Sequence, residues 1–147
     1  MSEITTSVQI VLPQHCNGYK KPRLFGGQIM AWIDIVGAVA ARRFTQRAVT
    51  TVCIDNLNFL FPAYLNDTVV QEAVVTWTGR TSLEVRVDSY VEQLDGTRKC
   101  VNRAYVVFVA LDDHDNPVEI PPFTPETEAE KQEYAAALER RRIRLGR

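Results

Sequence analysis

The chain has 147 residues, which is enough for one domain with a sizeable hydrophobic core. Hydrophobic residues make up 46% and charged residues 24%, a balance that excludes a disordered chain, and the net charge of −1 gives no electrostatic reason to expect nucleic acid as the main partner. The chain opens with no secretory signal and has no apolar run of ~18 residues that could cross a membrane. Its three cysteines are widely spaced, which argues against a disulfide framework or a zinc site and favours free thiols in the cytoplasm, with Cys53 and Cys100 buried.

One long helix is predicted near the N-terminus. Residues 7–12 predict a short strand that a proline stops, and residues 14–23 predict a loop. Residues 27–44 then predict a helix that is apolar on nearly all sides, so we expect it to be buried at the centre of the fold. Its C-terminal half is rich in glycine and alanine, which lets a sheet approach closely.

Four strands are predicted next, over residues 49–61, 68–77, 82–94 and 98–111. The third alternates apolar and polar residues, as a half-buried strand does, and Asp95-Gly96 predicts a hairpin before the fourth. Apolar residues on both faces of the fourth predict a central strand that is covered on both sides. The economical arrangement is an α+β fold in which an antiparallel sheet with hairpin connections curls around the helix. Its open edge and remaining apolar surface predict dimerisation.

The C-terminal tail differs in composition from the rest. Three prolines, at positions 121, 122 and 125, predict a stiff linker, and residues 126–145 predict a charged helix. Glutamates lie near the start of this helix and arginines near its end, a polarity that suits the helix dipole. Two interpretations stay open: a solvated helix, or a helix whose arginines contact phosphate.

Asp34 is the most unusual residue of the long predicted helix. It shares one helical stripe with residues that are small or apolar, so its carboxylate points where a core residue would: Gly27, Met30, Gly37 and Ala41. A buried, unpaired carboxylate is costly, and catalysis is one reason for a protein to keep it. The structural alternative is that Asp34 turns to solvent or pairs with an arginine across an interface. About 10 Å before it along the helix axis, the glycine pair offers free backbone amides that can hold an anion or a polarised carbonyl oxygen.

Motifs of other enzyme classes are missing from the sequence. It has no phosphate-binding P-loop, no serine-hydrolase elbow, no C-x-x-C and no H-E-x-x-H. Its two histidines, His15 and His114, both fall in predicted loops. Neither a serine triad nor a metal centre is therefore supported.

Six short segments occur in order along residues 8–122 and together carry a resemblance: Phe25-Gly26-Gly27, Trp32-Ile33-Asp34, Ala48-Val49-Thr50-Thr51, Phe59-Leu60-Phe61-Pro62, Gly79-Arg80-Thr81-Ser82 and Val107-Phe108-Val109-Ala110-Leu111-Asp112. The chain resembles an acyl-CoA thioesterase of the hotdog fold, of the cytosolic acyl-CoA hydrolase type. The resemblance implies a long helix wrapped by an antiparallel sheet of five or six strands. It assigns residues 1–122 to this domain and residues 123–147 to a C-terminal helical extension.

The resemblance also implies an assembly and a set of site residues. Two chains would pair with their sheets edge to edge and active sites at the dimer interface, and three such dimers would form a homohexamer. Asp34 matches the family's catalytic aspartate, Asn17 an asparagine that joins it from the partner subunit, and Thr51 a nearby threonine. The element that contacts CoA is matched by the turn Gly79, Arg80, Thr81 and Ser82.

The implied reaction converts acyl-CoA into free fatty acid and CoA, with no metal and no cofactor, since CoA is part of the substrate. The Gly27 amide, with that of Gly26, would receive the developing oxyanion. Asp34 would act as a general base on water or as a nucleophile, and the sequence leaves both roles open. Arg80 is the expected phosphate contact, with Arg103 and the tail arginines as alternatives. Three aromatic residues are expected in the core or in the wall of an acyl pocket: Trp32, Phe59 and Phe61.

Two rival functions compete with hydrolysis. A hydratase or dehydratase of the same fold would use a histidine beside the helical carboxylate, but His15 precedes the glycines. A non-catalytic acyl-CoA sensor is the alternative from a different class. Stoichiometric binding of acyl-CoA without turnover would identify such a sensor.

Overall fold

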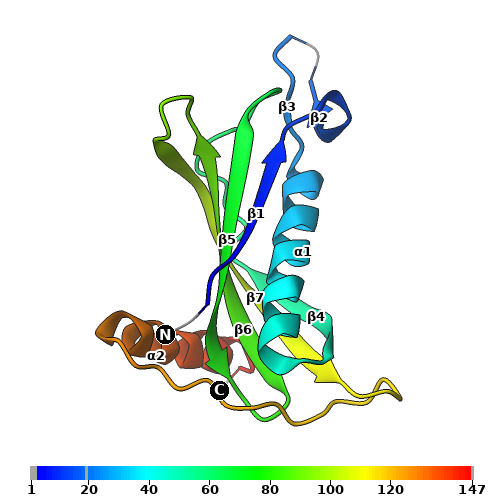
Figure 1. The fold of residues 1–147 in the computed structure, drawn as a ribbon, viewed down its shortest axis with the longest axis vertical. Helices are drawn as coiled ribbons and strands as arrows, with labels where there is room; N and C mark the ends of the chain where they lie inside the picture. Colours follow the sequence, from blue (N-terminus) through cyan, green and yellow to red (C-terminus); the bar gives the residue numbers. More distant parts are fainter. Residues whose placement is uncertain (1–2, 19, 147) are drawn as a thin grey trace.

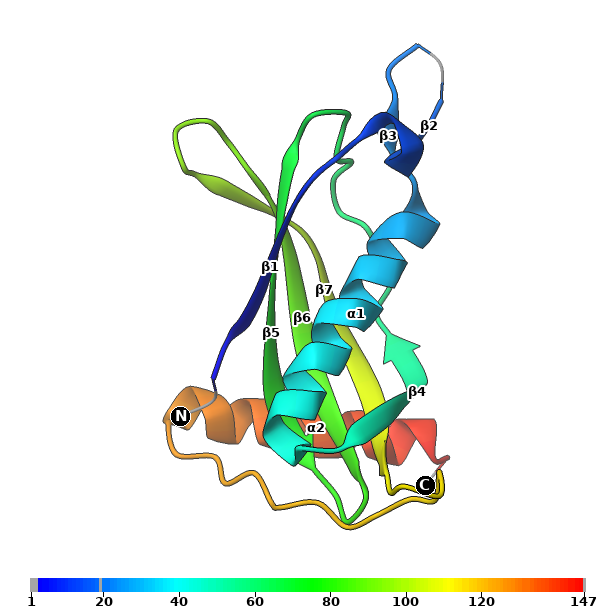
Figure 2. The same ribbon diagram turned by 45° about the vertical axis from the view of Figure 1, so that its right-hand side comes forward.

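The computed structural model describes residues 3–18 and 20–146, and its main feature is one long helix that lies along the inner face of a curled antiparallel sheet (Figure 1). The helix is α1 (Gly26–Thr45). The sheet has the strand order β1-β5-β6-β7-β4, with β1 (Thr5–Ile10), β4 (Ala48–Asp55), β5 (Thr68–Thr78), β6 (Ser82–Glu92) and β7 (Arg98–Leu111). A second helix, α2 (Glu128–Arg144), lies on the outer face, behind the sheet in Figure 2. The predicted α+β arrangement is confirmed.

Helix α1 buries one side against the sheet and leaves the other side open. Its core-facing side chains are mostly aliphatic: Ile29, Trp32, Ile33, Val36, Ala40 and Ala41. Gly37 lets the sheet come close, because a Cβ there would lie 3.3 Å from the Phe108 ring. The prediction of a helix buried all round is wrong for the single chain, since Ile35 is 61% exposed on the open side. The sheet curls around one side of the helix only.

The connection from β4 to β5 departs from the prediction of consecutive hairpins. Strands β5, β6 and β7 are neighbours joined by tight turns, whereas residues 56–67 carry the chain from the edge strand β4 across the sheet to β5, which lies next to the opposite edge strand β1. The strand predicted over residues 49–61 ends at Asp55, because Asn56 takes a left-handed backbone with φ of 65°. Beyond it, the Asn102 side-chain amide holds the segment by donating to the carbonyls of Asn56 and Asn58, at 3.0 and 2.8 Å.

Smaller differences lie near the N-terminus. The first strand begins and ends two residues earlier than predicted, because Thr5 to Ile10 follow β5 in register. The predicted loop of residues 14–23 contains a short helical turn, η1 (Pro13–His15), and a two-stranded hairpin of β2 (Cys16–Asn17) and β3 (Arg23–Leu24). The hairpin predicted at Asp95-Gly96 is confirmed, with the Gly96 amide donating to the Gln93 carbonyl at 2.9 Å. Cys53 and Cys100 are half-buried rather than buried.

Helix α2 is attached to the sheet mainly by ion pairs. Arg140 donates to both carboxylate oxygens of Glu84 at 2.9 and 2.8 Å, and Arg86 of the sheet donates to Glu133 at 3.1 Å. Glu84 is only 1% exposed, so this charge is buried together with its partner. Most residues of α2 are exposed, as the interpretation of a solvated helix expects, and Ala137 is its one buried residue, whereas Arg140 is occupied by a carboxylate. The helix starts two residues later than predicted, where Thr127 caps it by accepting from the Glu130 amide at 3.1 Å.

Candidate active site

Asp34 and Thr51 meet where the middle of α1 passes the edge strand β4. The Thr51 hydroxyl donates to Oδ1 of Asp34 at 2.6 Å. The chain reverses at Gln46, the left-handed cap of α1, so β4 runs back along the helix and brings Thr51 level with Asp34. The structure thus places together two residues that lie far apart in sequence.

The carboxylate of Asp34 is half-buried and does not enter the core. The prediction that Asp34 shares a buried helical stripe with small and apolar residues is therefore wrong. Gly37 and Ala41 of that stripe are buried, but Met30 is half-buried and Gly27 is exposed. The core side of α1 is centred instead on Ile33, so Asp34 falls at the boundary between the covered and the open side. A carboxylate at this boundary keeps contact with solvent and can still be held by Thr51.

The first turn of α1 presents unpaired backbone amides. Its first hydrogen bonds are donated by the amides of Gln28 and Ile29 to the Phe25 carbonyl, at 3.0 and 3.3 Å, so the amides of Gly26 and Gly27 precede them. No acidic side chain lies in this turn. A Cβ on Gly27 would overlap the Phe25 ring, whereas a Cβ on Gly26 would lie 3.7 Å from Phe59, an ordinary contact. This end of the helix can therefore stabilise a partial negative charge.

Gly27 and Asp34 lie two turns apart on the same helix, about 10 Å along its axis. One carbonyl group cannot contact both within a single chain. Asn17 is exposed and paired with Arg23 in the β2–β3 hairpin. Figure 1 shows this hairpin at the N-terminal end of α1. The structure does not bring Asn17 to Asp34 of the same chain.

The turn predicted to contact CoA lies at the other end of the molecule, next to the C-terminal end of α1 (Figures 1 and 2). The Gly79 amide donates to the Ser82 carbonyl at 2.7 Å, and the Thr81 carbonyl accepts from Ala110 at 2.9 Å. Arg80 points into solvent and lies 3.6 Å from Glu119. The turn is well formed, and its arginine is accessible to a ligand.

Two other titratable groups are held by neighbours. Arg103, an alternative phosphate contact, donates to both oxygens of Asp88 at 2.6 and 3.2 Å, and this pairing raises the pKa of its guanidinium. Burial, followed by the hydrogen bond to Asp55 and its charge, raises the pKa of the Cys53 thiol, which disfavours a nucleophilic thiolate on β4.

Sequence reasoning missed the buried carboxylates on the outer face of β6. Glu84 and Asp88 occupy the polar positions of an alternating strand, which usually face solvent. They are buried because α2 and three arginines cover them: Arg86, Arg103 and Arg140. The arginine-rich tail was the available signal, but the alternation gave no indication of where it would pack.

Comparison with known proteins identifies relatives of this chain. The family described as the thioesterase superfamily matches residues 22–96. The uncharacterized acyl-CoA thioester hydrolase YkhA of Bacillus subtilis (strain 168) is 36% identical over 93% of this chain and 79% of that protein. Acyl-coenzyme A thioesterase 11 of Mus musculus is 35% identical over 96% of this chain, which spans only 24% of that relative's length. A solved apo-hexameric acyl-CoA thioesterase superposes with a TM-score of 0.87 at 32% identity, covering 97% of this chain and 91% of that one.

Proposed function

The chain belongs to the thioesterase superfamily, in its acyl-CoA hydrolase branch with the hotdog fold, and on that premise we propose that it hydrolyses acyl-CoA to a free acid and CoA at Asp34. The observation that carries the proposal is the Asp34 carboxylate, half-buried at the boundary between the covered and the open side of α1 and oriented by the Thr51 hydroxyl at 2.6 Å. A carboxylate held in this way can take a proton from water or attack a carbonyl carbon.

The proposed reaction places the thioester oxygen at the first turn of α1. The Gly27 amide donates to this oxygen as it becomes negative, with the Gly26 amide beside it. In the general-base route, Asp34 takes a proton from a water whose oxygen bonds to the carbonyl carbon, the carbon–sulfur bond breaks, and the proton passes to the departing thiolate. In the nucleophilic route, Asp34 itself bonds to the carbonyl carbon, and the carbon–sulfur bond breaks so that CoA leaves as a thiolate. Water then hydrolyses the anhydride to the free acid and the Asp34 carboxylate, and the proton that water releases passes to the thiolate. Mass spectrometry of protein quenched during turnover separates the routes, because only the second adds the acyl mass to Asp34.

The proposed site takes residues from two chains. Gly27 and Asp34 of one chain are too far apart for one carbonyl. Strand β4 is an open edge, its Val52 and Ile35 of α1 are both exposed, and one relative of similar structure is a hexamer. Pairing of two β4 edges would bring Asp34 of one protomer to the first helical turn of the other, and would bring Asn17 there as well. We therefore propose a homodimer with interface active sites, assembled further into a homohexamer.

The remaining assignments follow from the same premise. Gly79, Arg80, Thr81 and Ser82 would contact CoA, with the accessible Arg80 guanidinium as its phosphate donor. Residues 1–122 would form the thioesterase domain, and residues 123–147 would be its helical extension. Neither helix in the described part of the chain is long and apolar enough to span a membrane. We propose the cytoplasm as the site of action.

Thiol release from a panel of acyl-CoAs, from acetyl to palmitoyl, tests the proposed reaction. Hydrolysis is expected with at least one member of the panel. Binding of every acyl-CoA without thiol release would contradict it and favour the acyl-CoA sensor.

A further inference from the structure

A cavity of about 600 Å³ lies on the outer face of the sheet, between the strands and α2. Figure 2 shows α1 and α2 on opposite faces of the sheet, so the strands separate this cavity from Asp34. Small-molecule sites in proteins usually measure ~300–1,000 Å³, and this volume falls within that range. The cavity, called here the α2 cavity, is lined by outward-facing side chains of β5, β6 and β7 and by residues of α2.

One side of the α2 cavity is apolar. Val74 of β5 belongs to this side, and the pairing of Thr5 with Ala73 carries Ile4 to the level of Val74. Ile4 is 58% exposed, so its aliphatic side chain is accessible to a ligand. Ala129, in the first turn of α2, is also part of the lining. This side can therefore cover a hydrocarbon group.

The other side of the α2 cavity is cationic. Across the sheet, Val74 pairs with Arg86 of β6, and Arg86 pairs with Tyr105 of β7, so the lining changes from apolar to polar along this row. Arg103 of β7 and Arg140 of α2 also line the cavity. The Arg140 guanidinium lies 3.6 Å from the centre of the Tyr105 ring. Three guanidinium groups thus gather over β6 and β7.

Three carboxylates accept hydrogen bonds from these guanidinium groups: Glu84, Asp88 and Glu133. Arg103 donates through Nε and Nη2 to the two oxygens of Asp88, and Arg140 donates through Nε and Nη2 to the two oxygens of Glu84. Arg86 donates to one oxygen of Glu133 at 3.1 Å, and Arg140 donates to the other at 3.4 Å. Every oxygen of the three carboxylates therefore already accepts a hydrogen bond.

The guanidinium groups keep donors that these carboxylates do not use. In the described part of the chain, no hydrogen bond is donated by Nη1 of Arg103, Nη1 of Arg140 or Nη2 of Arg86. The Arg103 side chain is 49% exposed, so a ligand can reach its free nitrogen. A guanidinium has N–H donors and no acceptor, so this side of the cavity offers donors to a ligand while its acceptors are occupied. Such a set of donors favours a ligand that brings a negatively charged acceptor.

We propose that the α2 cavity binds a free carboxylate with a hydrocarbon body, of the class of medium-chain fatty acids. The carboxylate accepts hydrogen bonds from the free nitrogens of Arg103 and Arg140, and the hydrocarbon body lies against Val74 and Ile4 on the apolar side. The inference does not require hydrolysis at Asp34, because the sheet separates the two places and none of the residues is shared.

Calorimetric titration of the full chain with sodium octanoate tests the class of ligand. Octanol has the hydrocarbon chain without the charge, and acetate has the charge without the chain. Octanoate is expected to bind at least ~10-fold more tightly than either, because it alone combines a charged hydrogen bond with buried methylene groups. Octanol or acetate binding as tightly as octanoate would contradict the proposal.

Two neighbouring alanines of α2 locate the site. Ala136 lines the α2 cavity and Ala135 does not, and both are exposed. Ala136→Trp fills the cavity and is expected to weaken octanoate binding at least ~10-fold, because a ligand would then have to displace the ring. Ala135→Trp adds the same ring outside the lining and should bind octanoate as the wild type does. Equal affinities of the two variants would place octanoate elsewhere on the molecule and overturn the assignment.

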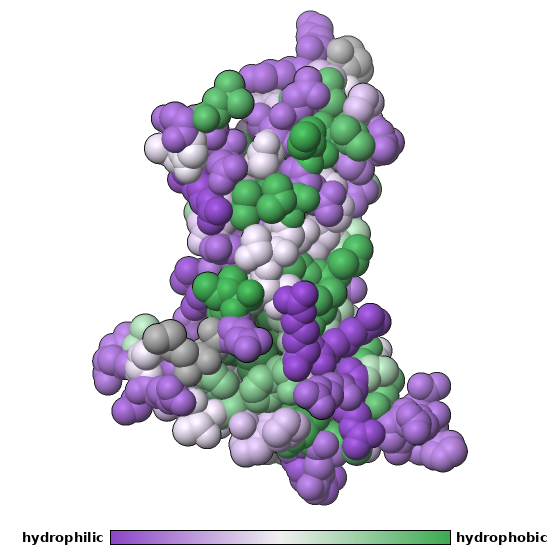
Figure 3. Space-filling model, in the orientation of Figure 1, coloured by the Kyte–Doolittle hydropathy of each residue, from purple (hydrophilic) through white to green (hydrophobic). Residues whose placement is uncertain are grey.

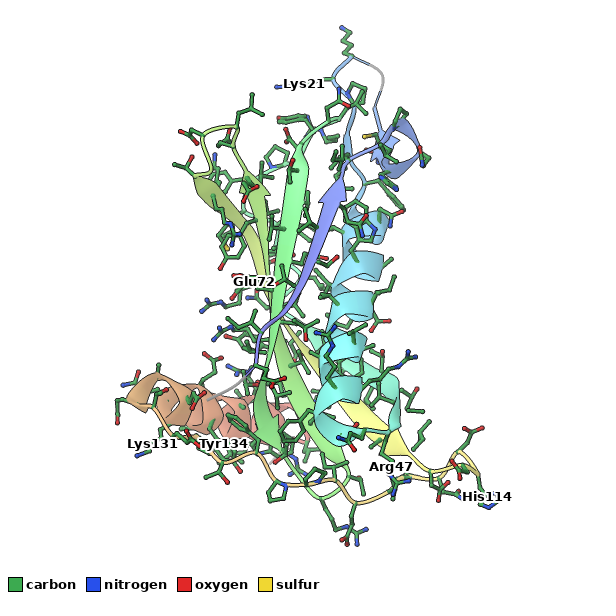
Figure 4. All side chains as sticks on the ribbon, viewed as in Figure 1. Lys21, Arg47, Glu72, His114, Lys131 and Tyr134 are labelled. Carbon is green, nitrogen blue, oxygen red and sulfur yellow. The ribbon has the colours of Figure 1, made fainter. Side chains whose placement is uncertain are left out.

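Removing one guanidinium tests the cationic side. Arg103→Gln removes the charge, while Asp88 still accepts from Arg86 at 3.2 Å. The variant is expected to bind octanoate at least ~10-fold more weakly and octanol as the wild type does. Lys131→Gln is the control for net charge, since Lys131, labelled in Figure 4, is exposed on α2 and lies outside the lining.

The controls separate binding from stability. Thermal unfolding shows whether each variant is folded at the temperature of the titration, and if Arg103→Gln is not, the comparison of Ala136→Trp with Ala135→Trp decides the question. An equal loss of octanoate affinity in Arg103→Gln and Lys131→Gln would mean that only net charge matters, and the assignment to the α2 cavity would then be wrong.

Discussion

The hydroxyl of Thr51 donates a hydrogen bond of 2.6 Å to Oδ1 of Asp34. This contact joins the middle of α1 to the edge strand β4, so the orientation of the carboxylate depends on how a helix and a strand are placed relative to each other. Among the described residues no donor reaches Oδ2, which leaves that oxygen for water or substrate.

Removing the Asp34 carboxylate tests its catalytic role. Asp34→Ala is expected to lower kcat for thiol release by ~10² or more, because the variant lacks the proposed general base or nucleophile. Asp34→Asn, which keeps the size and the bond to Thr51, should lose about as much activity. Circular dichroism and thermal unfolding should match the wild type, since Asp34 is half-buried and lies outside the core. Retained activity in both variants would exclude Asp34 from the chemistry.

Changing Thr51 tests orientation rather than chemistry. Thr51→Val keeps the shape but removes the donor, and a hydrogen bond to a charged group is worth ~1.5–3 kcal/mol, so kcat is expected to fall by ~10-fold or more. Thr51→Ser keeps the hydroxyl and should retain most of the activity. If serine and valine behave alike in the thiol-release assay, the hydrogen bond has no role in positioning Asp34.

The two glycines of the first helical turn form a matched pair. A methyl group on Gly27 would overlap the Phe25 ring and crowd the exposed amide, so Gly27→Ala should lower kcat/KM by up to ~10²-fold. A methyl group on Gly26 has ordinary room, 3.7 Å from Phe59, and Gly26→Ala should have a smaller effect. Steady-state kinetics of the two variants identifies which amide donates to the oxyanion. A larger loss of kcat/KM for Gly26→Ala than for Gly27→Ala would assign this role to the Gly26 amide instead.

The attachment of α2 depends on the Arg140 guanidinium. Arg140→Ala leaves Glu84 buried without its arginine, and breaking a buried pair costs about 3–5 kcal/mol of unfolding free energy. Arg142→Ala, which removes an exposed pair with Glu139, should change little. Urea unfolding of both variants gives the comparison. Equal and small changes would mean that α2 contributes no stability through Glu84.

Alkaline pH should weaken the fold through Tyr105. Burial is the largest cause that raises the pKa of this phenol above its usual value of about 10, so the folded state holds the proton more tightly than the unfolded state. The stability that the protonated Tyr105 phenol contributes is complete below the usual pKa and is lost as the pH rises through the folded-state pKa. Urea unfolding at about pH 9 and about pH 11 should show that the free energy of unfolding falls less for Tyr105→Phe than for the wild type. Phenylalanine keeps a ring beneath Arg140, whose guanidinium lies 3.6 Å from the Tyr105 ring centre. An identical loss in both proteins would contradict the assignment to Tyr105.

Surface hydrophobicity shows where a single chain is incomplete. Figure 3 shows hydrophobic patches among hydrophilic residues on the face that carries β1 and α1. Exposed apolar side chains occur on both: Val8 and Ile10 on the outer edge strand, and Ile35 on the helix. The apolar pattern all round α1 thus agrees with burial in an assembly, although in one chain the open side faces solvent.

Local patterns in the sequence were sufficient for most of the elements. Strand β7 matches its predicted bounds because a strong turn signal precedes it and its second half, from Ala104 to Leu111, is apolar on both faces, and α1 matches within one residue at each end because its helical pattern is long. The crossing of residues 56–67 could not be predicted in this way. Strand β4 pairs with β7 rather than with β5, which follows it in the sequence. Packing of the whole sheet decides this pairing, whereas the periodicity of a strand indicates only which of its faces is buried.

For the candidate site, the sequence by itself determined the residue types: a helical aspartate, a glycine pair at a helix start and a threonine in the next strand. Only the tertiary structure decided that Thr51 donates to Asp34 and that Asp34 lies at the boundary of the core. It also decided that Arg140 of α2 pairs with the buried Glu84. A helical stripe gives directions about one axis. Which of those directions is buried depends on where the sheet lies, and that position results from contacts summed over the whole chain.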